Sequence, residues 1–275
     1  MIWPFKPGAK KKIAKIEVKG AIAGATRDAV LEALEAIEDK GYPALLLRVD
    51  SPGGTVGDSQ EIYEALKRIQ DKVKIVASFG NISASGGVYI GMGCPNIMAN
   101  PGTITGSIGV ILRGNNLEKL LERVGVSFKV IKSGPYKDIL AFDRELTQPE
   151  QEILQALIDT SYSQFVQTVA DSRGLEVDAV KAFADGRVFT GQQALDLGLI
   201  DRLGTEEDAR RWVAELAGLD PEKAETVTIE SEKPFWKKIL PGSRSQATLP
   251  LPPQMKSWME FEMATSGMPL WMYRP

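Results

Sequence analysis

The stretch NISASGGVYI, residues 81–90, places a serine, Ser85, directly before two glycines and an apolar run. Serine is a favoured N-cap residue, but a serine that opens a helix also has free N–H groups and the positive end of the helix dipole beside it. Acyl transfer needs a nucleophile, a base and two N–H donors directed at the developing oxyanion. Ser85 could be that nucleophile, Gly86 one donor, and Gly54 or Gly53 of RVDSPGG the other.

The base in such a reaction cannot be histidine, because the sequence contains none. This rules out a Ser–His–Asp triad and any His-ligated metal, and the single cysteine rules out a thiolate zinc site. We therefore expect no metal and no cofactor. Lys132 and Lys137 flank a Gly–Pro turn in IKSGPYKD. Burial can lower a lysine pKa from about 10.4 by up to roughly 3 to 5 units, so a buried lysine can act as base. A hydroxyl such as Ser107, in TITGSIG, could orient the amine.

Each of these signals has an ordinary structural interpretation when it is taken alone. Ser85 alone is more often an N-cap than a nucleophile, and SPGG alone is an ordinary turn. Lys137 alone would be a solvated surface lysine, and Ser107 alone a loop hydroxyl. No single stretch is specific, and spacing by itself does not decide between the two interpretations.

The elements that must position these residues alternate between strands and helices from about residue 12 to residue 131. Such alternation predicts βαβ units and a mostly parallel sheet. Functional residues of α/β sheets lie beyond the carboxyl ends of the strands, where RVDSPGG, NISASGG and IKSGPYKD are expected. The predicted strands are KIAKIEVKG, ALLLRV, VKIVASF, PNIMANP and SFKVIKSG, and the predicted helices are TRDAVLEALEAIEDKG, DSQEIYEALKRIQDK, a run after Ser85 and NNLEKLLERVG.

The pattern becomes helical from Thr147 to about Gly218 and is followed by a predicted strand, ETVTIES. Asp201 or Thr205 could cap the last of these helices, TEEDARRWVAELAG. From Lys233 the chain is rich in proline, methionine and aromatic residues and lacks periodicity. These changes predict a basic leader (1–11), one α/β domain (12–230) and an extended tail (231–275).

Composition and charge limit the partners and the location. The net charge of −3 argues against a nucleic-acid partner. A single cysteine suits a reducing compartment, so we expect a cytoplasmic location. No apolar run reaches the roughly 18 to 20 residues that span a bilayer, and the N-terminus lacks the apolar region of a secretory signal. Trp3 and Phe5 beside Lys10, Lys11 and Lys12 could contact a membrane surface peripherally, although a solvated leader is the favoured interpretation.

Taken together, the stretches resemble the signal peptide peptidase A family of serine proteases, which work with a Ser–Lys dyad. Five of them occur in the family's order over about residues 13–203: VDSPGGTV, SASGGVYIG, PGTITGSIGVI, KSGPYKD and FTGQQALDLGLID. The resemblance implies that Ser85 is the nucleophile and that Lys137, rather than Lys132, is the general base. It implies that the hydroxyl of Ser107 positions the lysine amine.

The same resemblance implies an oxyanion hole made by Gly86 and Gly54, with Gly53 as the alternative one residue away. It implies the crotonase-like superhelical α/β fold of the caseinolytic protease, built from ββα repeats, with a helical C-terminal part. Single-domain members, which this chain resembles, form a dome-shaped octamer in which the serine of one subunit meets the lysine of the next. Members commonly begin with a transmembrane anchor, and none is expected in this chain.

The implied function is endoproteolysis of cleaved signal peptides or other extended apolar peptides. Two alternatives remain at this point: an acyl-CoA enzyme of the crotonase type, and a non-catalytic, membrane-associated scaffold ring. The aromatic residues of the tail could pack on a neighbouring subunit, touch a membrane or lie in the substrate groove, and subunit packing is favoured. These residues are Trp258, Phe261, Trp271 and Tyr273.

Overall fold

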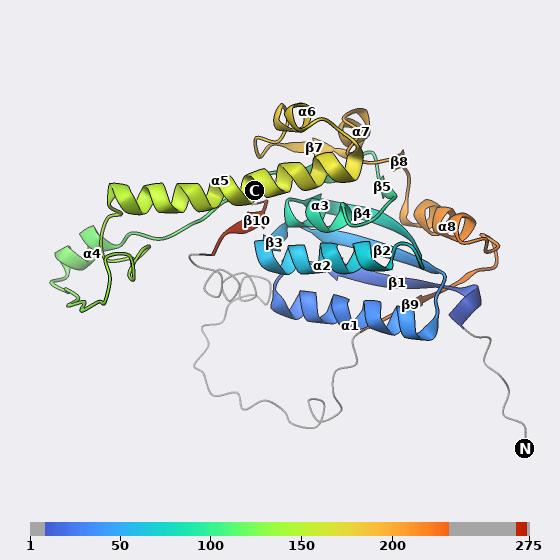
Figure 1. Ribbon diagram of the computed structural model, residues 1–275, viewed down its shortest axis with the longest axis horizontal. Coiled ribbons are helices and arrows are strands. Elements are labelled where there is room, and N and C mark those ends of the chain that lie inside the picture. Colours follow the sequence, from blue (N-terminus) through green and yellow to red (C-terminus); the bar gives the residue numbers. More distant parts are fainter. Residues whose placement is uncertain (1–8, 231–267, 274–275) are drawn as a thin grey trace, which may run out of the picture.

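The computed structural model describes residues 9–230 and 268–273 (Figure 1). The strands are β1 (Lys12–Lys19), β2 (Ala44–Ser51), β3 (Gly53–Thr55), β4 (Lys74–Ala84), β5 (Ile97–Ala99), β6 (Ile104–Gly106), β7 (Val188–Thr190), β8 (Arg202–Leu203), β9 (Glu225–Thr228) and β10 (Leu270–Met272). The helices are α1 (Gly24–Lys40), α2 (Val56–Ile69), α3 (Gly86–Gly91), α4 (Glu118–Arg123), α5 (Gln148–Arg173), α6 (Val177–Lys181), α7 (Gly191–Asp196) and α8 (Glu206–Leu216), with a short 3-10 turn at Ala9–Lys11.

A mixed eight-stranded sheet organises the described residues. Its order is β7-β6-β4-β2-β1-β9, with β5 pairing β4 and β8 pairing β5. β7 runs antiparallel to β6, and the other pairs of this sheet are parallel. The long strand β4 pairs first with β5 and then with β6 along the same edge. The mostly parallel α/β sheet that the sequence predicts is therefore confirmed.

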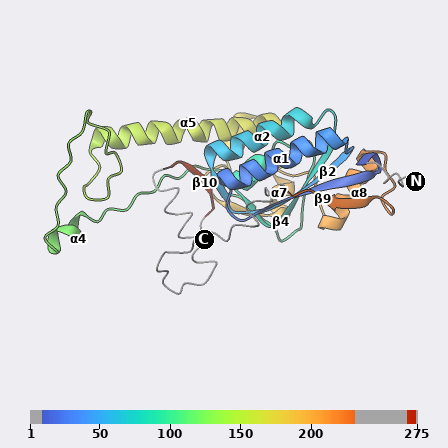
Figure 2. The same ribbon diagram turned by 90° about the horizontal axis from the view of Figure 1, so that it is seen from below.

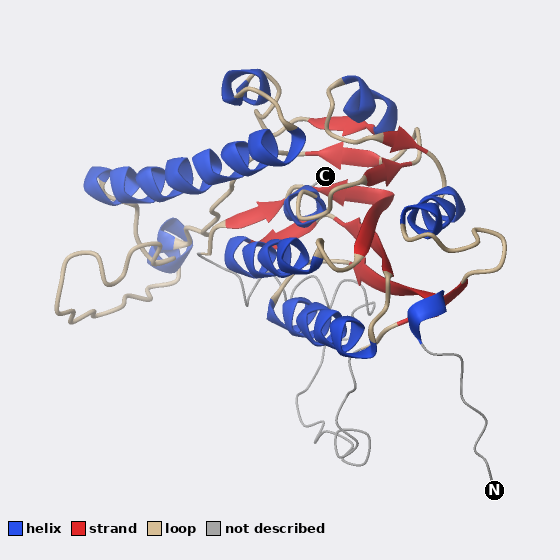
Figure 3. Cartoon of the chain, turned by 45° about the vertical axis from the view of Figure 1, so that its right-hand side comes forward, coloured by secondary structure: helices blue, strands red, loops and turns tan. Residues whose placement is uncertain are grey.

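Alternate residues of the central strands face two different helix layers, as the pleat of a strand requires. Leu45, Leu47 and Phe79 belong to the larger core, which α1, α2, α3 and part of α5 cover. Leu46 of β2 and Val76 of β4, which face the other side, belong to a smaller core against α8. Helices accordingly lie on both faces of the sheet (Figure 3). Burial on both faces explains the nearly continuous apolar runs in the sequence.

Local signals set several of the helix ends. Gly41 follows α1 with φ of 68°, a left-handed conformation that glycine adopts at little cost. Thr205 caps α8, because its side chain accepts from the backbone N–H of Asp208 while Asp208 binds back to Thr205. Of the two residues that could cap α8, the structure thus selects Thr205 over Asp201.

The segment SFKVIKSG is not a strand, and this prediction was wrong. Residues 126–132 have no assigned helix or strand, and their apolar side chains are exposed, Ile131 completely. The alternation of apolar residues there does not reflect pairing within this chain. The segment belongs to an arm, residues 112–147, which contains α4, extends away from the sheet and returns to the start of α5 (Figure 2).

Candidate active site

Ser85 stands between the end of β4 and the start of α3, in a strained backbone conformation. Its φ is 52° and its ψ is −114°, a region that a residue with a side chain occupies at a cost of about 1–3 kcal/mol. The side chain is 1% exposed, and its hydroxyl has no hydrogen-bond partner among the described residues. Ser85 therefore occupies the N-cap position without capping the helix. Such strain at a buried, unpartnered hydroxyl is typical of a functional position.

Ser107 lies beside Ser85 at the end of the neighbouring strand. β4 and β6 are parallel with Ala84 opposite Gly106, so the two serines are the next residues on each strand. The backbone N–H of Ser85 donates to the carbonyl of Gly106 at 2.8 Å. Ser107 is also buried and also has φ of 52°. The sheet register therefore brings together two hydroxyls that are 22 positions apart in the sequence.

The three candidate glycines converge on the same point. A Cβ placed on Gly86 would lie 3.0 Å from the backbone nitrogen of Gly54, and one on Gly53 would lie 2.7 Å from the backbone nitrogen of Gly86. A Cβ on Gly54 would overlap the carbonyl of Ile22. The backbones approach too closely for side chains, which explains glycine at these positions. The first N–H groups of α3 have no partner within the helix, and the backbone nitrogen of Gly54 lies close to them.

The carbonyl of Trp271 lies against these glycines. β10 pairs antiparallel with β3, with Trp271 opposite Gly54, and the N–H of Tyr273 donates to the carbonyl of Pro52 at 2.6 Å. A Cβ on Gly86 would lie 3.0 Å from the Trp271 carbonyl oxygen. The favoured interpretation, subunit packing, is wrong for Trp271, whose side chain is fully buried within its own chain. Trp258 and Phe261 lie outside the described residues.

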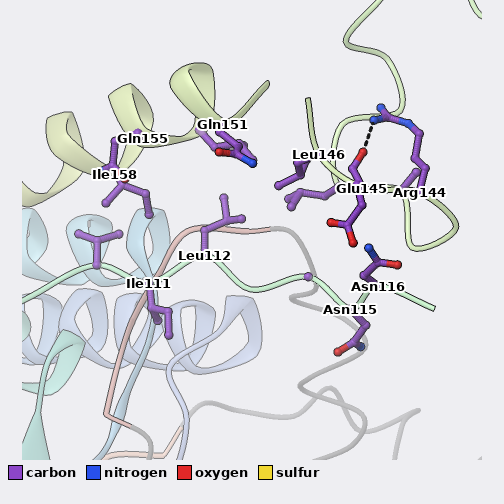
Figure 4. Close-up of a pocket in the computed structure, with 15 residues that line it drawn as sticks. Ile111, Leu112, Asn115, Asn116, Arg144, Glu145, Leu146, Gln151, Gln155 and Ile158 are labelled. Carbon is purple, nitrogen blue, oxygen red and sulfur yellow. Dashed lines mark hydrogen bonds between the residues drawn. The ribbon is translucent and has the colours of Figure 1, made fainter. Parts of the chain in front are cut away.

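Two neighbouring cavities lie next to this point. One, of about 490 Å³, is lined by residues that include Ser107, Tyr162, Met272 and Tyr273. The other, of about 580 Å³, lies between residues 110–116, the loop before α5 and the first turns of α5 (Figure 4). Both are lined by Val110, Ile111 and Ile158, so the two cavities are neighbours.

The predicted meeting of three loops is not found within this chain. Lys137 is exposed, and its loop IKSGPYKD lies in the arm, apart from the other two loops. The neighbouring Asp138 is held by Arg144, which also binds Glu150 in the first turn of α5. Phe165 packs on Trp271, whose carbonyl lies against Gly86, the residue after Ser85. Phe165 follows Glu150 by 15 residues, which is about 22 Å along the helix. Lys137 therefore cannot reach Ser85 of the same chain.

Ion pairs fix the loop that carries Lys137. Lys132 is engaged by Asp138 at 2.5 Å and by the carbonyl of Pro135 at 3.0 Å. The Arg144 guanidinium, and then the Lys132 ammonium, hold the pKa of Asp138 at about 2. The same guanidinium holds the pKa of Glu150 at about 2, and Glu150 is 2% exposed. Of the two lysines considered as base, Lys132 thus has a structural partner.

The aromatic cluster around Trp271 is the part of the site that the sequence did not reveal. Tyr89 of α3 and Phe165 of α5 pack on the indole ring, and Tyr63 of α2 packs on Tyr89. These residues are far apart in the sequence, and each looks like an ordinary core position in its own helix. Among the described residues, no group of three Asp, Glu, Cys or His side chains could hold a metal ion.

Comparison with known proteins decides the family. The model of the family described as "Peptidase family S49" matches residues 67–220, more than half of the chain. The chain belongs to peptidase family S49. It is therefore a serine protease, as the predicted resemblance implied, and the acyl-CoA and scaffold alternatives are not supported. None of the helices that the structure describes has the length and apolar character needed to cross a membrane.

Relatives of this peptidase support the assignment. The Synechocystis sp. candidate protease slr0021 is 69% identical and aligns over the whole of both chains. The serine protease SPPA, chloroplastic, of Arabidopsis thaliana is 33% identical over 72% of this chain and 31% of its own length. Both relatives are named as proteases, in agreement with the family model.

Solved structures confirm the predicted fold. A ClpP1 mutant from Listeria monocytogenes matches with a TM-score of 0.51 at 17% identity, covering 71% of this chain and 93% of its own. A mutant of the membrane-bound stomatin-specific protease 1510-N matches with a TM-score of 0.53 at 18% identity, covering 79% and 97%. The peptidase thus has the caseinolytic-protease-like α/β fold.

Proposed function

We propose that this peptidase hydrolyses peptide bonds through an acyl-enzyme on Ser85, with Lys137 of a neighbouring subunit as general base. The observation that carries the proposal is the state of Ser85: a buried, strained serine whose hydroxyl has no partner among the described residues, next to the backbones of Gly54 and Gly86. Few structural roles account for such a residue, whereas a nucleophile must keep its hydroxyl available to its base and to the substrate.

The proposed chemistry uses each residue in one role. The amine of Lys137 takes the proton of Ser85 as its oxygen attacks the carbonyl carbon, and the N–H groups of Gly86 and Gly54 stabilise the oxyanion. Gly53 is too close to Gly86 to accept a side chain, so its role is to allow the approach. The lysine then gives the proton to the leaving amine, and water hydrolyses the ester by the same relay. Ser107, beside Ser85, positions the incoming amine.

The arm supports a base supplied by another subunit. It holds Lys137 away from Ser85 of its own chain, and its exposed apolar side chains, among them Phe128, Val130 and Ile131, need a covering surface. A head-to-tail contact that repeats closes into a ring. We therefore propose a homo-oligomer, as in the octamer that the resemblance implies, in which each arm completes the next site and an isolated protomer is inactive.

The substrates in this proposal are extended apolar peptides, such as cleaved signal peptides. β10 already lies as an extended strand against β3 and is followed by a groove that contains Ile111 and Ile158. Strand addition of this kind gives affinity through the backbone and specificity through pockets for alternate side chains. The same proposal places the peptidase in the cytoplasm, in peripheral contact with a membrane.

The test is intact-mass analysis after treatment with a fluorophosphonate, which modifies activated serines. Wild type should gain one adduct, mapped to Ser85, and both Ser85→Ala and Lys137→Ala should lose it or form it far more slowly. Ser83→Ala is the matched control, because Ser83 lies in β4 two residues before Ser85 and its hydroxyl is also buried without a partner among the described residues. Lys129→Ala is the control for an exposed lysine of the arm. An unmodified wild-type protein would contradict the proposal.

A further inference from the structure

The position of β10 reveals how a substrate strand would lie. β10 has a partner on each side, because it pairs with β3 and because Leu270 and Ile111 exchange two backbone hydrogen bonds at 2.9 and 3.0 Å. The N–H and C=O of Leu270 thus point toward Ile111, and those of the next residue, Trp271, point toward Gly54. A segment from the end of the chain therefore occupies the place of an added central strand.

The register identifies which residue of β10 takes the position next to the nucleophile. The carbonyl of Trp271 faces Gly54 and lies against Gly86, the two backbones that supply the proposed oxyanion donors. A substrate carbonyl under attack must lie at this point. Trp271 therefore stands where the residue on the amino side of the cleaved bond would stand, and Met272 follows it on the leaving side.

The side chain in that position enters an aromatic pocket. The Trp271 indole is fully buried and stacks on Tyr89, with ring centroids 4.0 Å apart and an angle of 28° between the planes. The ring centroid of Phe165 lies 4.8 Å from that of the indole, and the ring centroids of Tyr63 and Tyr89 are 5.2 Å apart. Rings at these distances and offsets attract one another in addition to the effect of burial.

The pocket recognises the ring and not a polar group on it. The indole nitrogen of Trp271 has no hydrogen-bond partner among the described residues. The hydroxyl of Tyr89 is already engaged, because it accepts from the hydroxyl of Thr168 at 3.2 Å. Phenylalanine, tyrosine and tryptophan therefore all fit by shape and ring contact, whereas a small side chain would leave the space empty.

We propose that Tyr89 and Phe165, with Tyr63 packed behind Tyr89, form the subsite that selects the substrate residue on the amino side of the cleaved bond, and that it takes large aromatic side chains. This inference rests on the proposed function of Ser85 and adds the substrate class to it. The tail and a substrate then use one pocket, so Trp271 and the selected residue of a peptide exclude each other.

The test uses the assembled full-length enzyme and apolar peptides that differ only at one central residue: Trp, Phe, Tyr, Leu, Ala or Lys. Cleavage sites are mapped by mass spectrometry, and kcat/KM is measured for each peptide. Cleavage should follow the aromatic residue, with kcat/KM roughly 100-fold above that of the alanine peptide. Phe165→Leu should reduce this preference, Phe165→Ala should remove it, and Leu157→Ala, an exposed position on the same helix, should leave it unchanged.

Labelling of Ser85 by a small fluorophosphonate separates the two proposals, because the reagent does not need the aromatic pocket. Labelling of Ser85 together with equal cleavage after alanine and aromatic residues overturns the pocket assignment alone. Absence of labelling overturns the proposed function and, with it, the pocket. If Phe165→Ala does not fold, the milder Phe165→Leu still gives a result, since a preference as strong as that of wild type would contradict the assignment.

Discussion

Ser85 and Ser107 lie next to each other, each directly after one of the parallel strands β4 and β6, and both have a φ of 52°. In each case the strand has just ended, and the backbone turns sharply at the serine. Each turn leaves a buried hydroxyl at the same edge of the sheet. The two strained positions cost stability, which the surrounding sheet must supply.

Replacement of Ser85 by glycine should relieve one of these strains. Glycine adopts a positive φ readily, so Ser85→Gly should raise the free energy of unfolding by on the order of 1 kcal/mol while abolishing catalysis. Chemical denaturation at a fixed protein concentration measures the change. Ser83→Gly, at a residue of β4 without positive φ, should instead lower stability. A less stable Ser85→Gly protein would show that the backbone there is not strained.

Two neighbouring glycines separate a tight approach from open space. A Cβ on Gly54 would overlap the Ile22 carbonyl, whereas one on Gly57 would meet nothing within 4 Å. Gly54→Ala should therefore reduce stability, and any folded fraction should react about 100- to 1,000-fold more slowly because an oxyanion donor is displaced. Gly57→Ala, inside α2, should keep full activity and gain up to about 1 kcal/mol of stability. Peptidase rates and thermal unfolding measure both, and equal behaviour of the two variants would contradict the site.

The buried position of Trp271 predicts that this residue limits access of reagents to Ser85. Trp271→Ala removes the buried indole that anchors β10 over the glycines, so a fluorophosphonate should modify Ser85 faster than in wild type. Met268→Ala, at a residue that is 48% exposed just before β10, should leave the rate unchanged. Time-resolved intact mass gives both rates. A slower reaction in Trp271→Ala would mean that β10 builds the site instead of covering it.

The ion pairs of Arg144 with Asp138 and Glu150, which hold the arm to the first turn of α5, predict a pH dependence of stability. Folding lowers the pKa of Glu150 from 4.5 to about 2, chiefly through Arg144, and that of Asp138 from 3.8 to about 2. The stabilisation is therefore complete above about pH 4.5 and is lost as the pH falls toward 2. Thermal unfolding from pH 6 to pH 2 should show this loss in wild type. Glu150→Gln should be less stable at pH 6 and should flatten the curve, whereas Glu152→Gln, exposed on the same helix, should follow wild type.

The sequence predicted the parts of the fold that depend on local pattern. The buried runs of β1, β2 and β4 and the stop of α1 at Gly41 are correct, because strand alternation and a left-handed glycine are properties of short segments. SFKVIKSG was misread because apolar residues such as Phe128 and Val130 indicate burial somewhere, and the chain itself does not bury them. The short strands β3, β6 and β10 were missed because their pairing depends on distant residues.

The candidate site, like the fold, could be predicted from the sequence only where local pattern identifies its residues. Ser85 and its glycines could be proposed from a short stretch and its resemblance, and the structure brings them to one place. The strain of Ser85, the aromatic pocket and the place of Trp271 depend on contacts among β10, α2, α3 and α5. No local pattern carries that information.

The most direct test of the central claim is complementation between two inactive variants. Ser85→Ala and Lys137→Ala are purified separately, dissociated, mixed in equal amounts and reassembled, and peptidase activity is compared with each variant reassembled alone. If Ser85 of one subunit works with Lys137 of the next, random mixing should restore about one quarter of the wild-type activity. A mixture as inactive as its parts would contradict catalysis shared between subunits, because it would mean that both residues act within one chain or that Lys137 is not the base.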